Sequence, residues 1–90
     1  MEISFDPVKR AWTLAERGLD FADAGTVFAG KVFAFEDVRF AYPERRYSTI
    51  GMLEERMVVI LWVDAEDGRR VISMRKANAR ERKRFAHYLA

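Results

Sequence analysis

The sequence predicts an α+β fold in which two N-terminal helices lie on one face of an antiparallel sheet and a C-terminal helix lies at the other side. Three observations predict this fold. Apolar residues recur at helical spacing in the first third of the chain, three apolar segments separated by short polar turns follow, and a capped helical segment comes last. Since 90 residues correspond to one domain, we expect residues 1–90 to fold as a single unit.

The first elements are a short strand and a helix. Glu2–Phe5 alternates polar and apolar residues, as a strand does. Asp6 and Pro7 are typical of a helix start, because Asp caps the first turn and Pro fits the first helical position. The apolar residues that follow share one helical face: Val8, Ala11, Trp12 and Ala15. Gly18 is expected to end the helix.

A second helix is expected after Asp20, which can cap it, and Gly30 closes it. Its buried side would hold Phe21, Ala24, Val27 and Phe28. Four aromatic residues of the chain are expected in the core: Trp12, Phe28, Phe33 and Trp62.

Four later segments are predicted to be strands: Lys31–Glu36, Arg45–Leu53, Arg56–Asp64 and Arg69–Lys76. Pro43 indicates a loop over Phe40–Glu44. Short polar turns separate the last three strands, so we expect antiparallel hairpins. Met57–Val63 is apolar at every position, as expected of a central strand that is buried on both faces.

The last helix is predicted to begin after Asn78, because Asn78 and Glu81 have the spacing of a capping box. It would run to about Leu89. Its inner face would hold Ala77, Glu81, Phe85, Tyr88 and Leu89.

The composition excludes several classes of protein. There is no cysteine, which excludes disulfides and thiolate metal sites. There is no N-terminal apolar signal, and Met57–Val63 is too short to span a bilayer. We therefore expect a cytoplasmic chain that does not enter a membrane. His87 is the only histidine and cannot form a metal site alone, so no metal site is expected.

The charge is divided unevenly along the chain. Residues 1–68 carry eight Lys and Arg against thirteen Asp and Glu, a net charge of −5. Residues 69–90 carry eight Lys and Arg against one Glu, a net charge of +7. Such a basic segment suits a polyanion such as RNA, although a solvated basic helix would have the same composition.

Arginines flank the last predicted strand. Strict alternation places Arg69, Val71, Ser73 and Arg75 on one face and Arg70, Ile72, Met74 and Lys76 on the other. Arginine presents a planar fork that binds phosphate through two N–H groups, which makes Arg70 and Arg75 candidate phosphate ligands. The alternative is that they are edge charges paired with Glu36, Asp37 or Glu81.

Other candidates lie in the loop and the last helix. Glu44 beside Arg45 and Arg46 is either a general base with a charge clamp or a plain ion pair, and the local sequence favours the ion pair. Glu81 is expected to close the capping box and to contact an arginine as a second role. Tyr42 and Tyr47 could stack on a base, with half-buried packing as the alternative. His87 is interpreted as a surface residue, with a catalytic role as the alternative.

Several of these segments match a known family in order and spacing. They are Phe5-Asp6-Pro7 with Lys9, then Gly18 with Phe21, Ala24 and Phe28, then Tyr42-Pro43-Glu44-Arg45-Arg46 with Gly51, and finally Arg70–Ala77 with Glu81-Arg82. With these residues the chain resembles the BrnT toxins, relatives of the RelE-type ribonucleases.

This resemblance implies a RelE-like fold and metal-independent cleavage of RNA, in which the ribose 2′-hydroxyl attacks the adjacent phosphate and no cofactor is needed. The expected catalytic residues are Glu44, Arg46, Arg70 and Arg75. The expected RNA-binding residues are Tyr42, Tyr47, Lys76, Arg80 and Arg82, with Glu81 and Tyr88 in supporting positions.

The resemblance also implies a partner, a BrnA-type antitoxin with a ribbon-helix-helix part. The toxin would contact operator DNA only through this antitoxin. Two features depart from the family pattern. The Lys and His that often precede Gly18 are absent, and Phe85 stands where a Tyr is common. The alternative interpretation is a degenerate, non-catalytic module that binds RNA or its antitoxin.

Overall fold

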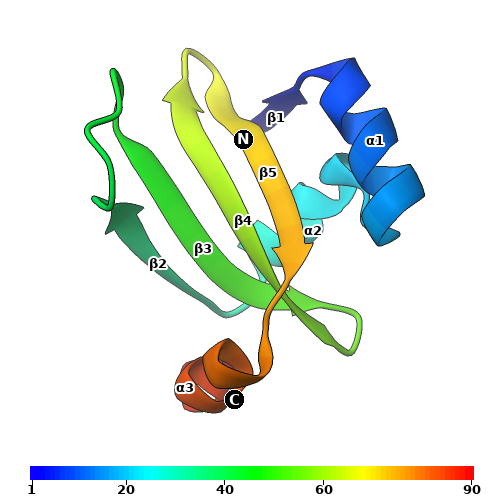
Figure 1. The fold of residues 1–90 in the computed structure, drawn as a ribbon, viewed down its shortest axis with the longest axis vertical. Helices are drawn as coiled ribbons and strands as arrows, with labels where there is room; N and C mark the ends of the chain where they lie inside the picture. The colour runs from blue at the N-terminus through cyan, green and yellow to red at the C-terminus, as the bar shows by residue number, and fades with distance from the viewer.

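The computed structural model describes residues 1–90 as an α+β fold with three α-helices and a sheet of five strands (Figure 1). The elements, in chain order, are β1 (Glu2–Phe5), α1 (Pro7–Arg17), a 3₁₀ turn (Phe21–Asp23), α2 (Ala24–Ala29), β2 (Val32–Asp37), β3 (Arg46–Leu53), β4 (Arg56–Ala65), β5 (Gly68–Lys76) and α3 (Ala79–Leu89). The α+β class is confirmed, and the bounds of β2 to β5 lie within one residue of the predicted ones. None of the helices is long and apolar enough to cross a membrane.

The sheet is mixed, so the prediction of an antiparallel sheet is wrong at one edge. The strand order is β1-β5-β4-β3-β2, with β4 central as predicted, and β1 runs parallel to β5. Turn signals report only on strands that follow one another, and β1 and β5 are far apart in the sequence. The backbones meet so closely at Gly68 that a Cβ there would lie 2.0 Å from the Glu2 carbonyl oxygen. Glycine is therefore required at this position.

Each face of the sheet carries its own apolar cluster. The 3₁₀ turn and α2 cover the face that holds the larger cluster, which includes Phe21, Val27, Ile60, Trp62, Val71 and Met74. Helix α3 covers the opposite face, over a smaller cluster of Ile50, Met57, Val59, Ala77 and Phe85. The smaller cluster holds α3 against the sheet through its apolar side, and much of the polar side of α3 stays exposed to solvent.

Helix α1 has the predicted ends but the opposite orientation. Asp6 accepts a hydrogen bond from the Val8 backbone N–H at 2.9 Å, and Gly18 ends the helix with φ of 66°. The apolar face, however, is turned to solvent: Trp12 is 54% exposed and Val8 is 77% exposed. The prediction that Trp12 belongs to the core is therefore wrong.

Polar contacts explain this orientation of α1, which lies beside the β1–β5 edge of the sheet (Figure 1). Arg10 donates to Asp20 at 2.7 and 3.0 Å, and Arg17 donates to the Met74 carbonyl at 3.0 Å. Of the helix residues, only Thr13 is buried. These two arginines thus hold α1 through polar contacts, while Val8 and Trp12 line only an open hollow beside Ile72 of β5, which periodicity alone does not reveal.

A β-bulge in β5 changes which arginines share a face. Trp62 pairs with Val71 while the preceding Leu61 pairs with Ser73, so one residue of β5 is extra. Val71 and Met74 consequently lie in the same apolar cluster. The strict alternation predicted from the sequence is therefore wrong, and Arg70 and Arg75 both lie on the α3 side of the sheet.

Candidate functional site

The largest cleft of the protein, about 440 Å³, lies on the α3 side of the sheet. Its floor consists of sheet residues and one helix residue: Phe35, Ser48, Ile50, Val59 and Phe85. Its charged walls come from the end of β2, the end of β5 and the first half of α3, and consist of Glu36, Asp37, Arg39, Arg75, Arg80, Glu81 and Arg84. The cleft therefore joins residues that are about 40 positions apart in the sequence.

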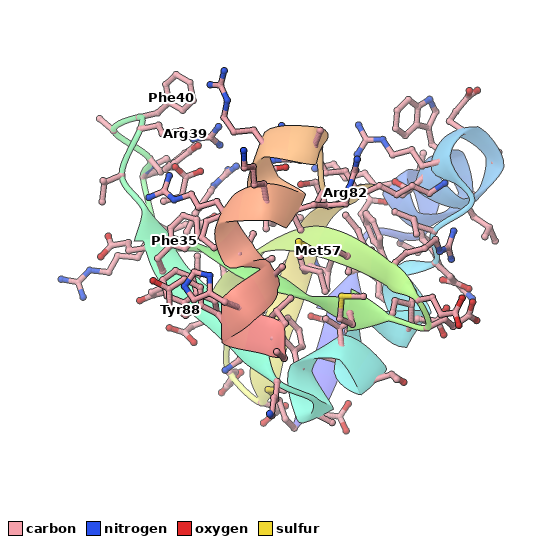
Figure 2. The ribbon with its side chains drawn as sticks, turned by 90° about the horizontal axis from the view of Figure 1, so that it is seen from below. Phe35, Arg39, Phe40, Met57, Arg82 and Tyr88 are labelled. Carbon is pink, nitrogen blue, oxygen red and sulfur yellow. The ribbon has the colours of Figure 1, made fainter.

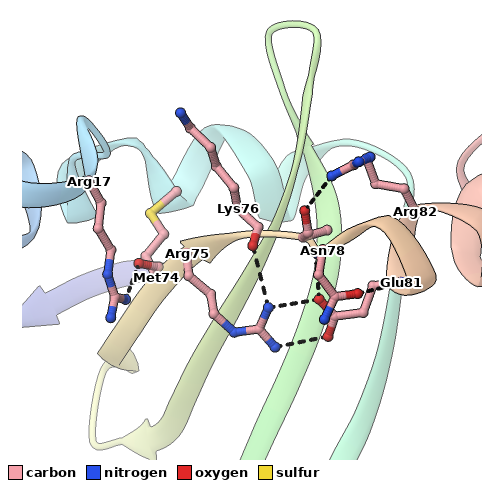
Figure 3. Close-up of polar contacts among 8 residues, drawn as sticks. Arg17, Met74, Arg75, Lys76, Asn78, Glu81 and Arg82 are labelled. Atoms are coloured by element: carbon pink, nitrogen blue, oxygen red, sulfur yellow. Dashed lines mark hydrogen bonds and ion pairs between the residues drawn. The ribbon is translucent and has the colours of Figure 1, made fainter.

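One wall is built on an ion pair between β5 and α3 (Figure 3). Arg75 Nη1 and Nη2 donate to the two carboxylate oxygens of Glu81 at 2.7 and 2.8 Å. Glu81 also accepts from the Asn78 backbone N–H at 2.9 Å, while Asn78 accepts from the Glu81 N–H at 2.8 Å. The predicted capping box is confirmed, and so is the second role of Glu81 as an arginine partner.

The charges of this pair are fixed at neutral pH. The pKa of Glu81 is lowered to about 2, mainly by the hydrogen bond from Arg75 and to a smaller extent by the more distant charge of Arg39. The hydrogen bond to Glu81 in turn raises the pKa of Arg75. Because Glu81 occupies one side of the guanidinium, the Nε side stays available, and the Arg75 side chain is 42% exposed. Arg75 is thus an oriented cation that can still bind an anion.

The opposite wall is built on a buried carboxylate. Asp37, the last residue of β2, accepts hydrogen bonds from Arg39 Nε and Nη2 at 2.9 and 2.8 Å and from the Tyr42 hydroxyl at 3.0 Å. These hydrogen bonds, mainly that from Arg39, hold the pKa of Asp37 far below its usual range. Arg39 is a site residue that was not predicted from the sequence. An acid two residues before an arginine, at the end of a predicted strand, is the signal that could have found it.

Two further arginines of the cleft have no acidic partner. The chain forms three ion pairs, Arg10–Asp20, Arg39–Asp37 and Arg75–Glu81. Arg80 and Arg84 line the cleft outside these pairs and contribute uncompensated positive charge. Such a cleft concentrates anions at its surface. Arg80 was predicted to bind RNA, whereas Arg84 was not selected.

The loop between β2 and β3 holds a smaller hollow of about 280 Å³ beside the cleft. Tyr42, Glu44 and Arg46 line it, and the Arg46 guanidinium lies 4.4 Å from the centre of the Tyr42 ring. Arg46 Nε is buried without a hydrogen-bond partner. The Glu44 ion pair favoured by the local sequence does not form. These three predicted residues therefore lie together, next to the cleft.

The remaining predicted residues lie elsewhere. Tyr47 stacks on Trp62 at 4.7 Å on the α2 side of the sheet, and Lys76 points away from Arg75 (Figure 3). Arg82 donates to the Ala77 carbonyl at 2.8 Å. Arg70 is exposed on the α3 side but does not line the cleft.

The end of α3 carries an aromatic stack outside the cleft. Tyr88 lies on Phe33, with ring centres 4.3 Å apart, and the exposed His87 ring lies 4.1 Å from Tyr88. The Tyr88 ring also lies 6.3 Å from the Phe85 ring, so it extends the apolar cluster under α3 towards the end of the helix.

Comparison with known families identifies the chain. A sequence profile of the family described as "Ribonuclease toxin, BrnT, of type II toxin-antitoxin system" matches residues 5–81. The chain belongs to the BrnT family. The matched region includes the charged wall residues of the cleft from Glu36 to Glu81, but not Arg84. BrnT membership makes the chain a ribonuclease toxin, with RNA as the target and an antitoxin as the partner. No curated protein matches the chain.

Proposed function

We propose that this BrnT chain is an endoribonuclease that cleaves RNA without a metal ion or other cofactor. The 2′-hydroxyl oxygen of one nucleotide attacks the adjacent phosphorus and the P–O5′ bond breaks. The 2′-hydroxyl loses a proton and the leaving 5′-oxygen gains one, so the products are a 2′,3′-cyclic phosphate and a 5′-hydroxyl. The observation that carries the proposal is the cleft, where Glu81 orients Arg75 and the charges of Arg80 and Arg84 are not paired.

The cleft suits the charge that develops during this reaction. The phosphorane-like transition state carries extra negative charge, and fixed cations stabilise it without reorganising. In the proposal, Arg75 binds the scissile phosphate through its free edge, while Arg80 and Arg84 neutralise neighbouring phosphates. Arg46 and Glu44, in the adjacent hollow, and Arg70, further along β5, contact the RNA on either side. Lys76, Tyr47 and Arg82 point elsewhere and contribute less.

Cleavage in the presence of EDTA tests the proposal. Purified protein should cut bulk RNA equally fast with EDTA and with Mg²⁺, and the fragments should end in cyclic phosphate. A substrate with 2′-deoxyribose at the cut position should resist, because it lacks the nucleophile. RNA binding without cleavage would instead favour the non-catalytic module, an alternative consistent with the buried Phe85, which offers no hydroxyl to the cleft.

We further propose a RelE-like fold for residues 1–90, acting as one domain in the cytoplasm, and a BrnA-type antitoxin with a ribbon-helix-helix part that links the toxin to operator DNA. The inhibitor of a basic cleft is expected to present acidic residues to it. The proposed contact surface is the α3 side of the sheet, which carries Arg70 and Arg75 of β5 and the basic residues of α3.

Bound antitoxin should therefore protect Arg70, Arg75 and Arg82 from an arginine-selective reagent, as measured by mass spectrometry. Arg10 provides a matched internal control. Its side chain is 42% exposed and lies 2.7 Å from a carboxylate, as that of Arg75 does. Arg10 labelling should be unchanged in the complex. Equal labelling of Arg75 in the complex and in the free toxin would mean that the antitoxin binds another surface.

A further inference from the structure

The loop after β2 presents an unusual combination of a buried anchor and exposed groups. The Asp37 side chain is 2% exposed, yet it is ionised and accepts hydrogen bonds from the backbone N–H and the guanidinium of Arg39 and from Tyr42. Burying a carboxylate is unfavourable unless such hydrogen bonds compensate for the lost water. Asp37 therefore fixes the positions of the two side chains that bind it, Arg39 and Tyr42.

Arg39, which Asp37 binds, is an exposed arginine. The Arg39 side chain is 69% exposed, and its Nε and Nη2 atoms face Asp37, so Nη1 points away from the anchor. An arginine that is already fixed loses little conformational freedom when it binds a phosphate. Arg39 also lines the same cleft as Arg75, and its charge reaches both Arg75 and Glu81.

An exposed aromatic ring lies next to this arginine. Phe40 is 65% exposed, the Arg39 guanidinium lies 5.6 Å from its ring centre, and Tyr42 supports the ring edge-on at 5.8 Å. Figure 2 shows Arg39 and Phe40 side by side on the loop, beside α3. Single-stranded RNA is commonly bound by this pairing of an aromatic face for the base with a cation for the phosphate.

We propose that this loop is a nucleotide-binding subsite of the cleft, in which Phe40 stacks on an unpaired base and Arg39 binds the phosphate next to it. The inference rests on the proposed function, because it takes single-stranded RNA as the ligand. It adds that RNA crosses the cleft from the Arg39 wall to the Arg75 wall, and that a base outside the scissile bond contributes to recognition.

A binding assay with non-cleavable RNA tests the subsite apart from catalysis. The probe is a labelled single-stranded 2′-O-methyl RNA, titrated by fluorescence anisotropy at several salt concentrations. Phe40→Ala should weaken binding roughly 5- to 150-fold through the lost stacking, and Phe40→Trp should restore it. Arg39→Ala should reduce the slope of log affinity against log salt by about 0.7, the value for one phosphate contact on a single strand.

Helix α1 supplies matched controls, since Trp12 is an exposed aromatic residue and Arg10 a carboxylate-bound arginine on the far side of the molecule. Trp12→Ala and Arg10→Ala should leave affinity and salt slope unchanged. Wild-type affinity and slope in the Phe40 and Arg39 variants would overturn the subsite, as would a wild-type chain that does not bind the probe. A wild-type chain that binds the probe but does not cut ordinary RNA would overturn the ribonuclease proposal and leave the subsite intact.

Discussion

Replacing Arg75 by alanine is expected to slow RNA cleavage about 10²–10³-fold, the usual cost of losing one preorganised donor to a developing negative charge. Arg75 lines the cleft and Glu81 already holds its guanidinium in place, so little conformational freedom is lost when it binds a phosphate. The rate should be measured under single-turnover conditions with bulk RNA in EDTA. Binding of the 2′-O-methyl probe should fall much less than the rate does.

The fold should survive this replacement, because the capping hydrogen bonds between Glu81 and Asn78 do not involve Arg75. Circular dichroism verifies that the helices are retained. Arg10→Ala is the matched control, since it removes an ion pair of the same length and exposure at the other end of the molecule. A cleavage rate that stays at the wild-type value in Arg75→Ala would remove Arg75 from the mechanism.

Replacing Phe21 by alanine is expected to lower the free energy of unfolding by about 3–5 kcal/mol, the typical cost of emptying a buried phenylalanine site. Phe21 is 1% exposed and packs edge-on against Phe5 at 6.0 Å, so it links the 3₁₀ turn to β1. This loss is a large fraction of the free energy of unfolding of a typical small domain, which is about 5–15 kcal/mol. The variant should therefore unfold at much lower urea concentration.

Phe40→Ala is the control for this prediction, since Phe40 is exposed and its replacement should change the free energy of unfolding by no more than about 0.5 kcal/mol. Equilibrium unfolding in urea, followed by the fluorescence of the buried Trp62, measures both variants. A loss below about 1 kcal/mol for Phe21→Ala would show that the cluster repacks around the missing ring.

The features of the fold that could be predicted from the sequence are those set by neighbouring residues. The caps at Asp6, Gly18 and Asn78 depend on one helical turn, and the hairpins from β3 to β5 depend on short turns. The features that could not be predicted depend on distant partners. Periodicity gives α1 an apolar face but not the side that meets the sheet, and alternation along β5 gives no sign of the extra residue of the bulge.

The residues of the candidate site also fall into those that could be predicted from the sequence and those that could not. Glu81 could be predicted from the capping box, and Arg75 from its place at a basic strand end together with the family resemblance, which also implied Arg80. Arg39 and Arg84 were not selected, because only the sheet brings the end of β2 to the first turns of α3. Tyr47 was selected for its place near the loop, yet strand pleating turns it to the α2 side, where it stacks on Trp62.

The parallel pairing of β1 with β5 also has a consequence for how the protein forms. Glu2 pairs with Gly68, so this contact closes a loop of 66 positions, and contacts between residues so far apart slow folding. During synthesis β1 has no strand partner until β5 has emerged, and the cleft needs α3, which follows later still. A nascent chain therefore carries no complete RNA-binding surface, and a toxin made on ribosomes acquires its cleft only after nearly all of residues 1–90 have been translated.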